Sequence, residues 1–320
     1  MVKTSSHHSV TAITSLYKSE EYLELFLQNC LEQSIFHETF FALNISCPSK
    51  YELQMIRKYR PYFKGQIAVK QNSSLIPIYR AWNEMCREAN TPYVAIWNVD
   101  DLRTPNSLAS QLSLMQSGNF RSVAGPFSIV RHFGSTHGII VNQSESPQSH
   151  WIEGMLHGPF FMFQKADLSI LRGFDEQFKV AGDFDFAVRL TSLGRVGYTN
   201  NLLGYYLNER KGLSTSSSST LPGERERIYL RYGVVKKIDY SILIEAAIFD
   251  FASIYVLGEK YLIQESMENF TQIRNSQLNK ATTRSQISKM VRFIFVIIKN
   301  RFKSKLKSSR VIKIYLKTRR

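Results

Sequence analysis

The chain has 320 residues, of which 43% are hydrophobic and 21% charged, as is usual for a folded soluble protein of one large domain or two smaller ones. Its three cysteines, Cys30, Cys47 and Cys86, have no metal-ligand spacing and no even-numbered framework, which favours a reduced, cytoplasmic compartment. Residues 1–9 contain no apolar stretch like that of a signal peptide.

The net charge of +15 at pH 7 is concentrated at the end of the chain. Residues 281–320 hold 13 of the 41 Lys and Arg residues and no Asp or Glu. The other 28 basic side chains nearly balance the 26 acidic ones, so the preceding residues are close to neutral. The basic character therefore says little about the chemistry of the main part of the chain.

Short apolar runs alternate with helical patterns over the first hundred residues. The predicted strands are 9–15, 39–45, 66–70 and 93–99, and the predicted helices are 20–33, 51–62 and 77–89. The run 93–99 (YVAIWNV) is continuously apolar, as expected of a strand covered on both faces. This alternation predicts an α/β fold with a largely parallel sheet.

Two acids, Asp100 and Asp101, directly follow the strand 93–99. Thr104 is a predicted helix cap, with Pro105 as the first residue of a helix that runs to about residue 115. The acids therefore lie at the carboxyl edge of the sheet, where open α/β sheets bind ligands. Paired acids in such a loop are often only helix caps. With Asn98, however, they gather the oxygen ligands that Mg²⁺ or Mn²⁺ prefers beside a substrate phosphate.

A second acidic cluster begins another predicted helix, 184–193. It follows a β-rich stretch, 123–141, and a short predicted strand, 160–163. Asp183 and Asp185 lie at the helix start, where the helix dipole favours negative charge. Both could be capping residues, but a carboxylate near an acceptor hydroxyl could also act as a general base.

The remaining sequence predicts a low-complexity loop, a helical region and a basic tail. The loop is 214–223 (STSSSSTLPG), and the helical region is 240–274. The tail's uninterrupted apolar run, 293–298, is too short for a span of about 20 residues, so we expect an amphipathic segment on an anionic membrane surface. A solvated tail and a helix docked on the main domain are the alternatives. No nucleic-acid motif is present, so nucleic acid is not an expected partner.

Ordered segments of the chain resemble glycosyltransferase family 2, the inverting enzymes with a GT-A fold. Residues 13–34 resemble the first βα unit of the family, and 78–83 (IYRAWN) resemble the helix that leads toward its DXD site. Residues 98–101 (NVDD), followed by Pro105, are similar to that site. Residues 173–176 (GFDE) and 182–185 (GDFD) resemble the acceptor-side motif that carries the base. The resemblance covers about residues 8–235.

The resemblance implies roles for individual residues. Asp100 and Asp101 would bind metal and nucleotide diphosphate, with Asp101 the preferred direct ligand, and Asp183 would be the catalytic base. The other implied donor-binding residues are Thr14 and Ser15 near the nucleobase or ribose, Asn98 in the metal motif, and Arg210 and Lys211 near the diphosphate. Asp185 and His157 are expected to support the acceptor site, although a histidine at a strand start is more often only packed.

One departure from the family pattern concerns the nucleobase. Many members carry an acid-rich segment after the second strand, but here residues 44–49 (NISCPS) contain no acid. The donor nucleobase is therefore left open. A non-catalytic binding or scaffold protein with this fold stays an alternative. A nucleotidyltransferase is disfavoured, because residues 14–19 lack the glycine of a triphosphate-binding loop.

The sequence thus predicts a GT-A type nucleotide-binding sheet, Rossmann-like and mostly parallel, flanked by helices and followed by a C-terminal helical extension. The predicted parts are a glycosyltransferase domain (1–235), a helical extension (236–280) and the basic tail (281–320). The predicted activity is metal-dependent inverting transfer from a nucleoside-diphosphate sugar to a glycan or lipid-linked acceptor, with Mn²⁺ or Mg²⁺ as cofactor. The expected location is the cytoplasm, with the tail at the inner face of the cell membrane.

Overall fold

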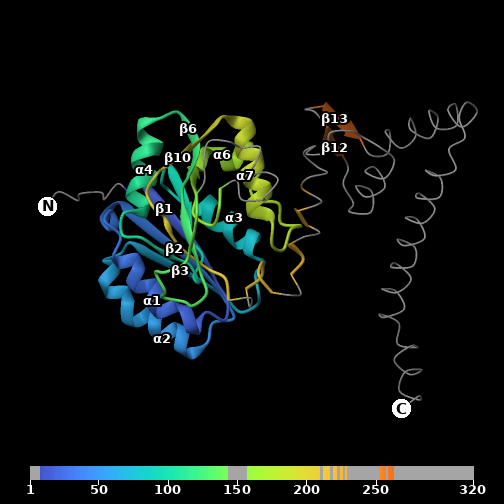
Figure 1. Ribbon diagram of the computed structural model, residues 1–320. Coiled ribbons are helices and arrows are strands. Elements are labelled where there is room, and N and C mark those ends of the chain that lie inside the picture. The colour runs from blue at the N-terminus through green and yellow to red at the C-terminus, as the bar shows by residue number, and fades with distance from the viewer. Residues whose placement is uncertain are drawn as a thin grey trace, which may run out of the picture. The chain divides into compact units, whose positions relative to one another are not determined.

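The computed structural model describes residues 8–142, 157–209, 212–216, 219–221, 224, 225, 228, 253–256 and 259–262 (Figure 1). The chain forms two compact units, Met1–Ile228 and Tyr229–Arg320. The predicted boundaries at residues 235 and 280 fall outside the described residues and stay predictions.

A seven-stranded sheet organises the first unit, and its strand order is β10-β6-β9-β4-β1-β2-β3. The strands are β1 (Val10–Leu16), β2 (Thr39–Ser46), β3 (Ile67–Asn72), β4 (Tyr93–Ile96), β6 (Phe120–Ala124), β9 (Met162–Gln164) and β10 (Arg195–Tyr198). Strands β1 to β4 pair in parallel, as do β6 and β10, whereas β9 is antiparallel to both of its neighbours. The predicted α/β fold with a largely parallel sheet is confirmed.

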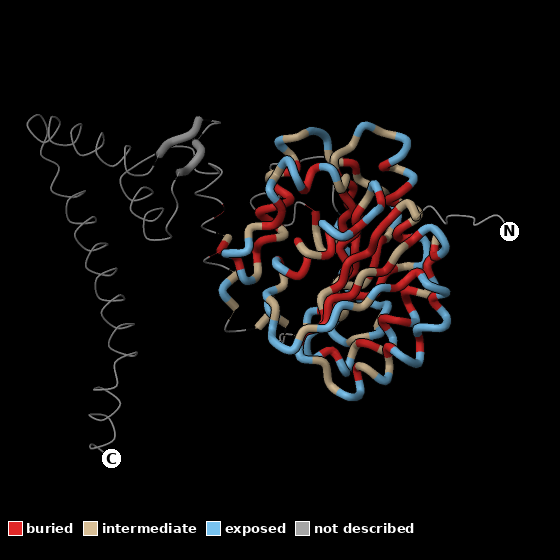
Figure 2. The backbone as a smooth tube through the Cα atoms, turned by 180° about the vertical axis from the view of Figure 1, so that it is seen from behind, coloured by how far each residue is buried: buried red, intermediate tan, exposed pale blue. Residues whose placement is uncertain are grey.

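Helices cover both faces of this sheet, and the alternation of side chains along each strand decides which face each residue enters. The helices are α1 (Glu20–Leu31), α2 (Lys50–Tyr59), α3 (Ile78–Glu88), α4 (Ser107–Ser117), α6 (Lys165–Ile170) and α7 (Gly182–Leu193). Val10, Ala12 and Leu16 of β1 share a core cluster with residues of α1, α2 and α4. The other core contains an aromatic cluster from α3, β9 and α7. Figure 2 shows the buried strands between these layers.

A smaller four-stranded sheet begins with a strand that follows β4 in the chain. Its order is β5 (Leu102–Arg103), β11 (Gly204–Leu207), β7 (Phe127–Val130) and β8 (Ile139–Val141). Gly204 permits the close pairing of β11 with β5, because an added Cβ would lie 2.4 Å from the Leu102 carbonyl oxygen. The small sheet therefore brings residues after position 204 next to those that follow β4.

Local interactions explain where the elements start and end. Ser49 and Glu52 form a reciprocal capping box at the start of α2. The predicted helix start at Thr104 and Pro105 is wrong, because α4 begins at Ser107 with Asn106 as its N-cap. The Thr104 hydroxyl instead donates to the Leu202 carbonyl at 2.6 Å, which keeps Thr104 engaged with the chain segment before β11.

In the second unit, the structure describes two strands, β12 (Ser253–Val256) and β13 (Glu259–Leu262). They pair in antiparallel register, so the predicted helix across 240–274 is wrong for these residues. Both strands carry the β-branched or aromatic side chains that favour extended backbone, and only Leu257 and Gly258 separate them. Within the described parts of the chain, no helix is both long and apolar enough to cross a membrane.

Candidate functional site

Asp101 is a buried carboxylate at the carboxyl end of β4, and it joins the two sheets of the first unit. Its Oδ1 accepts a hydrogen bond from the backbone N–H of Leu207 in β11 at 3.0 Å. Its Oδ2 accepts one from Asn98 Nδ2 at 3.1 Å. The side chain is 1% exposed, and burial followed by the charge of Asp100 raises its pKa well above the usual value. Asp101 is thus both held in place and energetically unfavourable as an isolated charge.

A buried cation, Arg103, lies beneath this acid. Its guanidinium donates to Ser107, Gln111 and the Ile96 carbonyl, with distances of 2.7 to 2.8 Å. It also lies over the Trp97 ring, whose Nε1 donates to the Asp101 carbonyl oxygen. Burial lowers the pKa of Arg103 to about 9, and the Asp101 charge opposes that shift. The positive charge of Arg103 therefore favours the charged form of Asp101 and opposes part of the effect of burial.

Asp100 has the more accessible carboxylate of the two. It is half-buried, and its side chain accepts no hydrogen bond from another described residue. Burial and the negative charge of Glu209 both raise the pKa of Asp100. Glu209 follows β11 and accepts a hydrogen bond from the Tyr22 hydroxyl of α1. Asp100 therefore lies in an acidic environment that a cation would relieve.

Asp183 lies in the first turn of α7, far along the chain from Asp100 and Asp101. Its Oδ1 accepts hydrogen bonds from the Phe184 backbone N–H at 2.8 Å and from the Tyr79 hydroxyl at 3.3 Å. No described residue donates to Oδ2. Burial raises the pKa of Asp183, while these hydrogen bonds and the charge of Arg225 act in the opposite direction. A carboxylate with a raised pKa and a free oxygen is suited to accept a proton.

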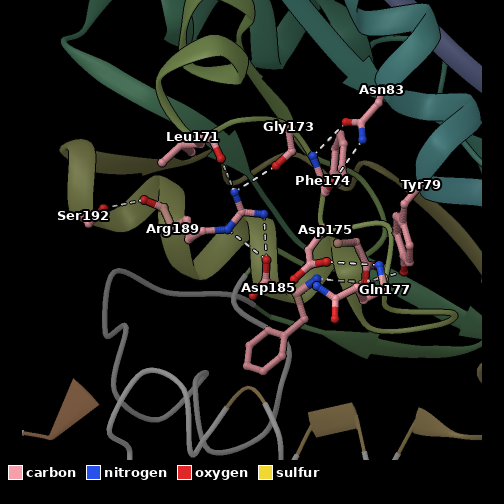
Figure 3. Close-up of polar contacts among 12 residues, drawn as sticks. Tyr79, Asn83, Leu171, Gly173, Phe174, Asp175, Gln177, Asp185, Arg189 and Ser192 are labelled. Atoms are coloured by element: carbon pink, nitrogen blue, oxygen red, sulfur yellow. Dashed lines mark hydrogen bonds and ion pairs between the residues drawn. The ribbon is translucent and has the colours of Figure 1, made fainter. Parts of the chain in front are cut away.

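Asp185 has a different environment from Asp183, although the two are separated by one residue. It is fully buried and accepts a hydrogen bond from Arg189 Nε at 2.9 Å (Figure 3). Arg189 also donates to the Leu171 and Gly173 carbonyls at 2.6 and 2.8 Å. Asp185 therefore anchors the turn 171–173 to α7 through Arg189.

The charges of both acidic groups act on Tyr206 of β11. Its hydroxyl lies 3.0 Å from the Ser214 hydroxyl, and its ring packs edge-on against Phe127. Burial raises the pKa of Tyr206 to about 12, and the charges of Asp101, Asp100 and Asp183 all contribute to that shift. The Tyr206 side chain is thus within electrostatic range of both acidic groups.

Ser15 lies at the carboxyl edge of the sheet beside the acids, opposite Asn44 in β2. Thr14 is buried, and Ser15 is half-buried. Asn44 accepts a hydrogen bond from Asn72 Nδ2 at 2.6 Å, and its own amide Nδ2 has no partner. Polar amides therefore occupy the edge where many family 2 members have an acid.

His157 is in the interior of the first unit. It is 3% exposed, its Nε2 lies 2.5 Å from the Ser122 hydroxyl, and its ring packs edge-on against Phe161. Burial lowers the pKa of His157 to about 3, so the imidazole is neutral at physiological pH. These contacts favour a packed histidine over one that faces an acceptor.

Asn98, Asp100 and Asp101 thus form one acidic group beside Leu207 of β11, and Asp183 lies at the start of α7 beside Tyr79. Tyr206 is within electrostatic range of both, and Ser15 lies at the carboxyl edge of the sheet. Arg210 and Lys211 lie outside the described residues, so their roles stay predictions. The sequence analysis does not indicate Tyr206, Tyr79 or Glu209 as parts of the site. Tyr79 lies in the segment 78–83 that resembles a family motif, whereas Tyr206 and Glu209 lie outside the segments that do.

The described residues contain no group of three or more His, Cys, Asp and Glu side chains that could hold a metal ion by themselves. Asp100 and Asp101 nonetheless provide carboxylate oxygens, and the Oδ1 of Asn98 is not used in its hydrogen bond to Asp101. This donor set fits a hard divalent cation that shares its shell with substrate phosphates.

Comparison with known proteins identifies related sequences and folds. The model of a family described as Glycosyl transferase family 2 matches residues 11–171. No curated protein shows a significant match. The S. aureus TarS fragment 1–349, solved with UDP-GlcNAc, has a TM-score of 0.57 at 18% identity, over 74% of this chain and 66% of that one.

Two further structures give similar results. The same TarS fragment solved with UDP has a TM-score of 0.54 at 16% identity, over 87% of this chain and 77% of that one. The mannosyltransferase PcManGT from Pyrobaculum calidifontis, solved with GDP-Man and Mn²⁺, has a TM-score of 0.53 at 13% identity, over 92% and 81%. At these identities the likeness concerns the fold, which is the GT-A fold.

Proposed function

The chain belongs to glycosyl transferase family 2, and we propose that it moves a sugar from a nucleoside-diphosphate sugar to a hydroxyl acceptor, with inversion and with the help of a divalent metal. It is a glycosyltransferase by family and fold. The observations that carry the finer proposal are the buried acidic group that Leu207 and Asn98 hold after β4 and the Asp183 carboxylate that Tyr79 and Phe184 hold at the start of α7. We propose that the first group forms the donor site and that Asp183 is the base for the acceptor.

The donor half of the proposal rests on the end of β4. Asp100, supported by Asn98 and Asp101, would hold a divalent cation, which supplies positive charge to the departing diphosphate. The contacts favour Asp100 as the direct ligand, because both oxygens of Asp101 already accept hydrogen bonds. Ser15 and Thr14 stay the proposed contacts of the nucleoside, since they lie on β1 beside this edge.

The acceptor half of the proposal rests on Asp183. Its Oδ2 would accept the proton of the acceptor hydroxyl as that oxygen attacks the anomeric carbon. A new C–O bond forms on one face while the bond to the diphosphate oxygen breaks on the other, so the configuration inverts. Tyr79 and the Phe184 N–H hold Oδ1, which leaves Oδ2 available for the proposed contact with the acceptor.

The donor sugar and nucleobase remain to be identified. TarS was solved with UDP-GlcNAc and PcManGT with GDP-Man and Mn²⁺, so we propose UDP- and GDP-sugars as the first donors to test. An acceptor in surface polysaccharide or lipid-linked glycan synthesis stays part of the proposal. Closure of the loop 214–223 over the donor would exclude water.

Release of nucleoside diphosphate from a panel of UDP- and GDP-sugars, with Mn²⁺ or with EDTA, tests the proposal. We expect metal-dependent release with one donor, and the anomeric proton coupling of the product in NMR spectra should show inversion. Retention of configuration would contradict the role of Asp183 as a base. Donor binding without turnover under any condition would favour the binding or scaffold alternative, which the missing acid at residues 44–49 supports.

We also propose that the basic tail contacts an anionic membrane surface. Residues 281–320 carry 13 cations and no acids, and polybasic segments gain about 1 kcal/mol per cation near such a surface. Flotation of the full chain with anionic and neutral vesicles tests this. Replacing Lys303, Lys305 and Lys307 with Gln should reduce the recovery of the protein with anionic vesicles. Equal recovery of the variant and the unmodified chain would contradict the proposal.

A further inference from the structure

Glu224 places a buried carboxylate against three successive backbone N–H groups. Its Oε2 accepts hydrogen bonds from Val180 and Ala181, each at 2.9 Å. The Lys179 N–H is 3.1 and 3.2 Å from the two carboxylate oxygens, and the Thr220 hydroxyl donates to Oε1 at 2.8 Å. Three consecutive N–H groups of this kind form an anion-binding concavity, and here it holds a side chain of the same protein.

This carboxylate is charged despite its burial. Glu224 is 4% exposed, and burial alone would raise its pKa. The N–H groups of Ala181 and Val180 and the Thr220 hydroxyl outweigh that effect and lower the pKa of Glu224 below its usual value. Hydrogen bonds to a charged acceptor are stronger than neutral ones, so the contact holds the turn 179–181 firmly.

The turn that Glu224 holds leads directly into Asp183. Ala181 is the N-cap of α7, and Asp183 is the second residue of that helix. The Tyr79 hydroxyl donates to the Val180 carbonyl at 2.6 Å, so both polar groups of Val180 have partners. Gly182 packs against the Tyr79 ring so closely that an added Cβ would lie 2.7 Å from ring carbons. The backbone that carries Asp183 is therefore fixed from two sides.

We propose that Glu224 is a positioning residue for Asp183, an inference that rests on the proposed function of Asp183 as a base. Glu224 acts through the turn 179–181 and does not contact the reacting atoms. In the chain, Glu224 follows Ser214, whose hydroxyl is hydrogen-bonded to the Tyr206 hydroxyl. The chain thus contacts Tyr206 through Ser214 and the turn before Asp183 through Glu224.

Steady-state kinetics of Glu224→Ala and Glu224→Gln in the full chain test this role. Displacement of a catalytic group by about 1 Å can lower a rate about 10²-fold, so we expect a kcat loss of that order in Glu224→Ala. The donor KM should stay within about twofold, because the donor half is on β4 and β11. Glu224→Gln should lose less, because its amide oxygen can still accept from Val180 and Ala181.

Asp167→Asn is the matched control. Asp167 is also a buried carboxylate, with an ion pair to Arg121 at 3.1 Å. It follows Gln164, which pairs with Tyr93 at the amino end of β4, the edge opposite the site. The control should lower Tm while kcat, measured well below Tm, stays unchanged. An equal kcat loss in Asp167→Asn and Glu224→Ala would overturn the positioning role.

Hydrogen exchange of the amides at residues 179–181 separates this inference from the proposed function. Glu224→Ala should accelerate exchange at these amides, whether or not the assay contains the right donor, and Asp167→Asn should not. Unchanged exchange in Glu224→Ala overturns the inference directly. If the unmodified chain transfers no sugar from any donor, the proposed function fails, and the exchange rates still decide whether Glu224 holds the turn.

Discussion

Replacing Asp183 with Asn removes the proposed base and changes little else. The Asn side chain has the same shape, and its carbonyl oxygen can still accept from the Phe184 N–H and the Tyr79 hydroxyl. General base catalysis contributes about 10²- to 10⁴-fold to a rate. We therefore expect kcat to fall by that factor, which corresponds to about 3 to 5 kcal/mol of activation free energy. Donor affinity should not change.

The same substitution should not destabilise the fold. Because burial raises the pKa of Asp183, the folded state holds this proton to a higher pH than the unfolded state does. Stability is therefore lost as pH rises from the unfolded pKa of about 3.9 through the raised folded value. Asn carries no such charge, so at neutral pH the Tm of Asp183→Asn should equal or exceed that of the unmodified chain.

Single-turnover kinetics with a saturating donor, calorimetric donor titration and thermal unfolding give the three readouts. The unmodified chain should lose activity as pH falls through the raised pKa of Asp183, and this acidic limb should be absent in the variant. Asp185→Asn is the contrasting variant, because it breaks the buried pair with Arg189 and should lower Tm. Unchanged kcat in Asp183→Asn would refute its assignment as the base.

Four further substitutions test individual contacts. Asp101→Ala leaves the Leu207 N–H unpaired and should cost about 1 to 3 kcal/mol of unfolding free energy in denaturant titrations, whereas Asp100→Asn should mainly weaken Mn²⁺-dependent donor binding; the reverse pattern would contradict the assigned roles. Tyr79→Phe should lower both stability and kcat, because the Val180 carbonyl loses its donor; an unchanged kcat would show that this hydroxyl does not position Asp183. Ser49→Ala should cost about 1 kcal/mol through the lost helix cap of α2 without affecting kcat, and a kcat loss would connect α2 to the reaction.

The sequence predicts the parts of this fold that depend on local pattern. The apolar run 93–99 predicts a buried strand, and β4 follows that expectation, although it ends earlier, at Ile96, and the two acids come after it. The helix predicted for residues 184–193 is also present, although α7 begins at Gly182 and thus has both acids in its first turn. Both acidic groups could be predicted from the sequence, because one follows a predicted strand and the other begins a predicted helix.

Contacts between distant segments were not predictable in this way. The pairing of β11 with β5 and β7 places Leu207 on Asp101, and no periodicity within either segment indicates it. For the same reason, the sequence does not indicate Tyr206 or Glu224 as parts of the site. Whether Asp101 or Asp100 is the direct metal ligand stays a prediction, and the hydrogen bonds to the two Asp101 oxygens, which only the fold shows, bear on it.

Binding of a nucleotide sugar in the presence and absence of Mn²⁺ tests the central claim most directly. Titration calorimetry of the full chain with UDP- and GDP-sugars should reveal at least one donor whose affinity rises with Mn²⁺ and falls again with EDTA. Asp100→Asn should abolish the Mn²⁺ effect for that donor, whereas Asp183→Asn should retain it. Absence of binding for every nucleotide sugar with metal present would contradict the assignment of this site.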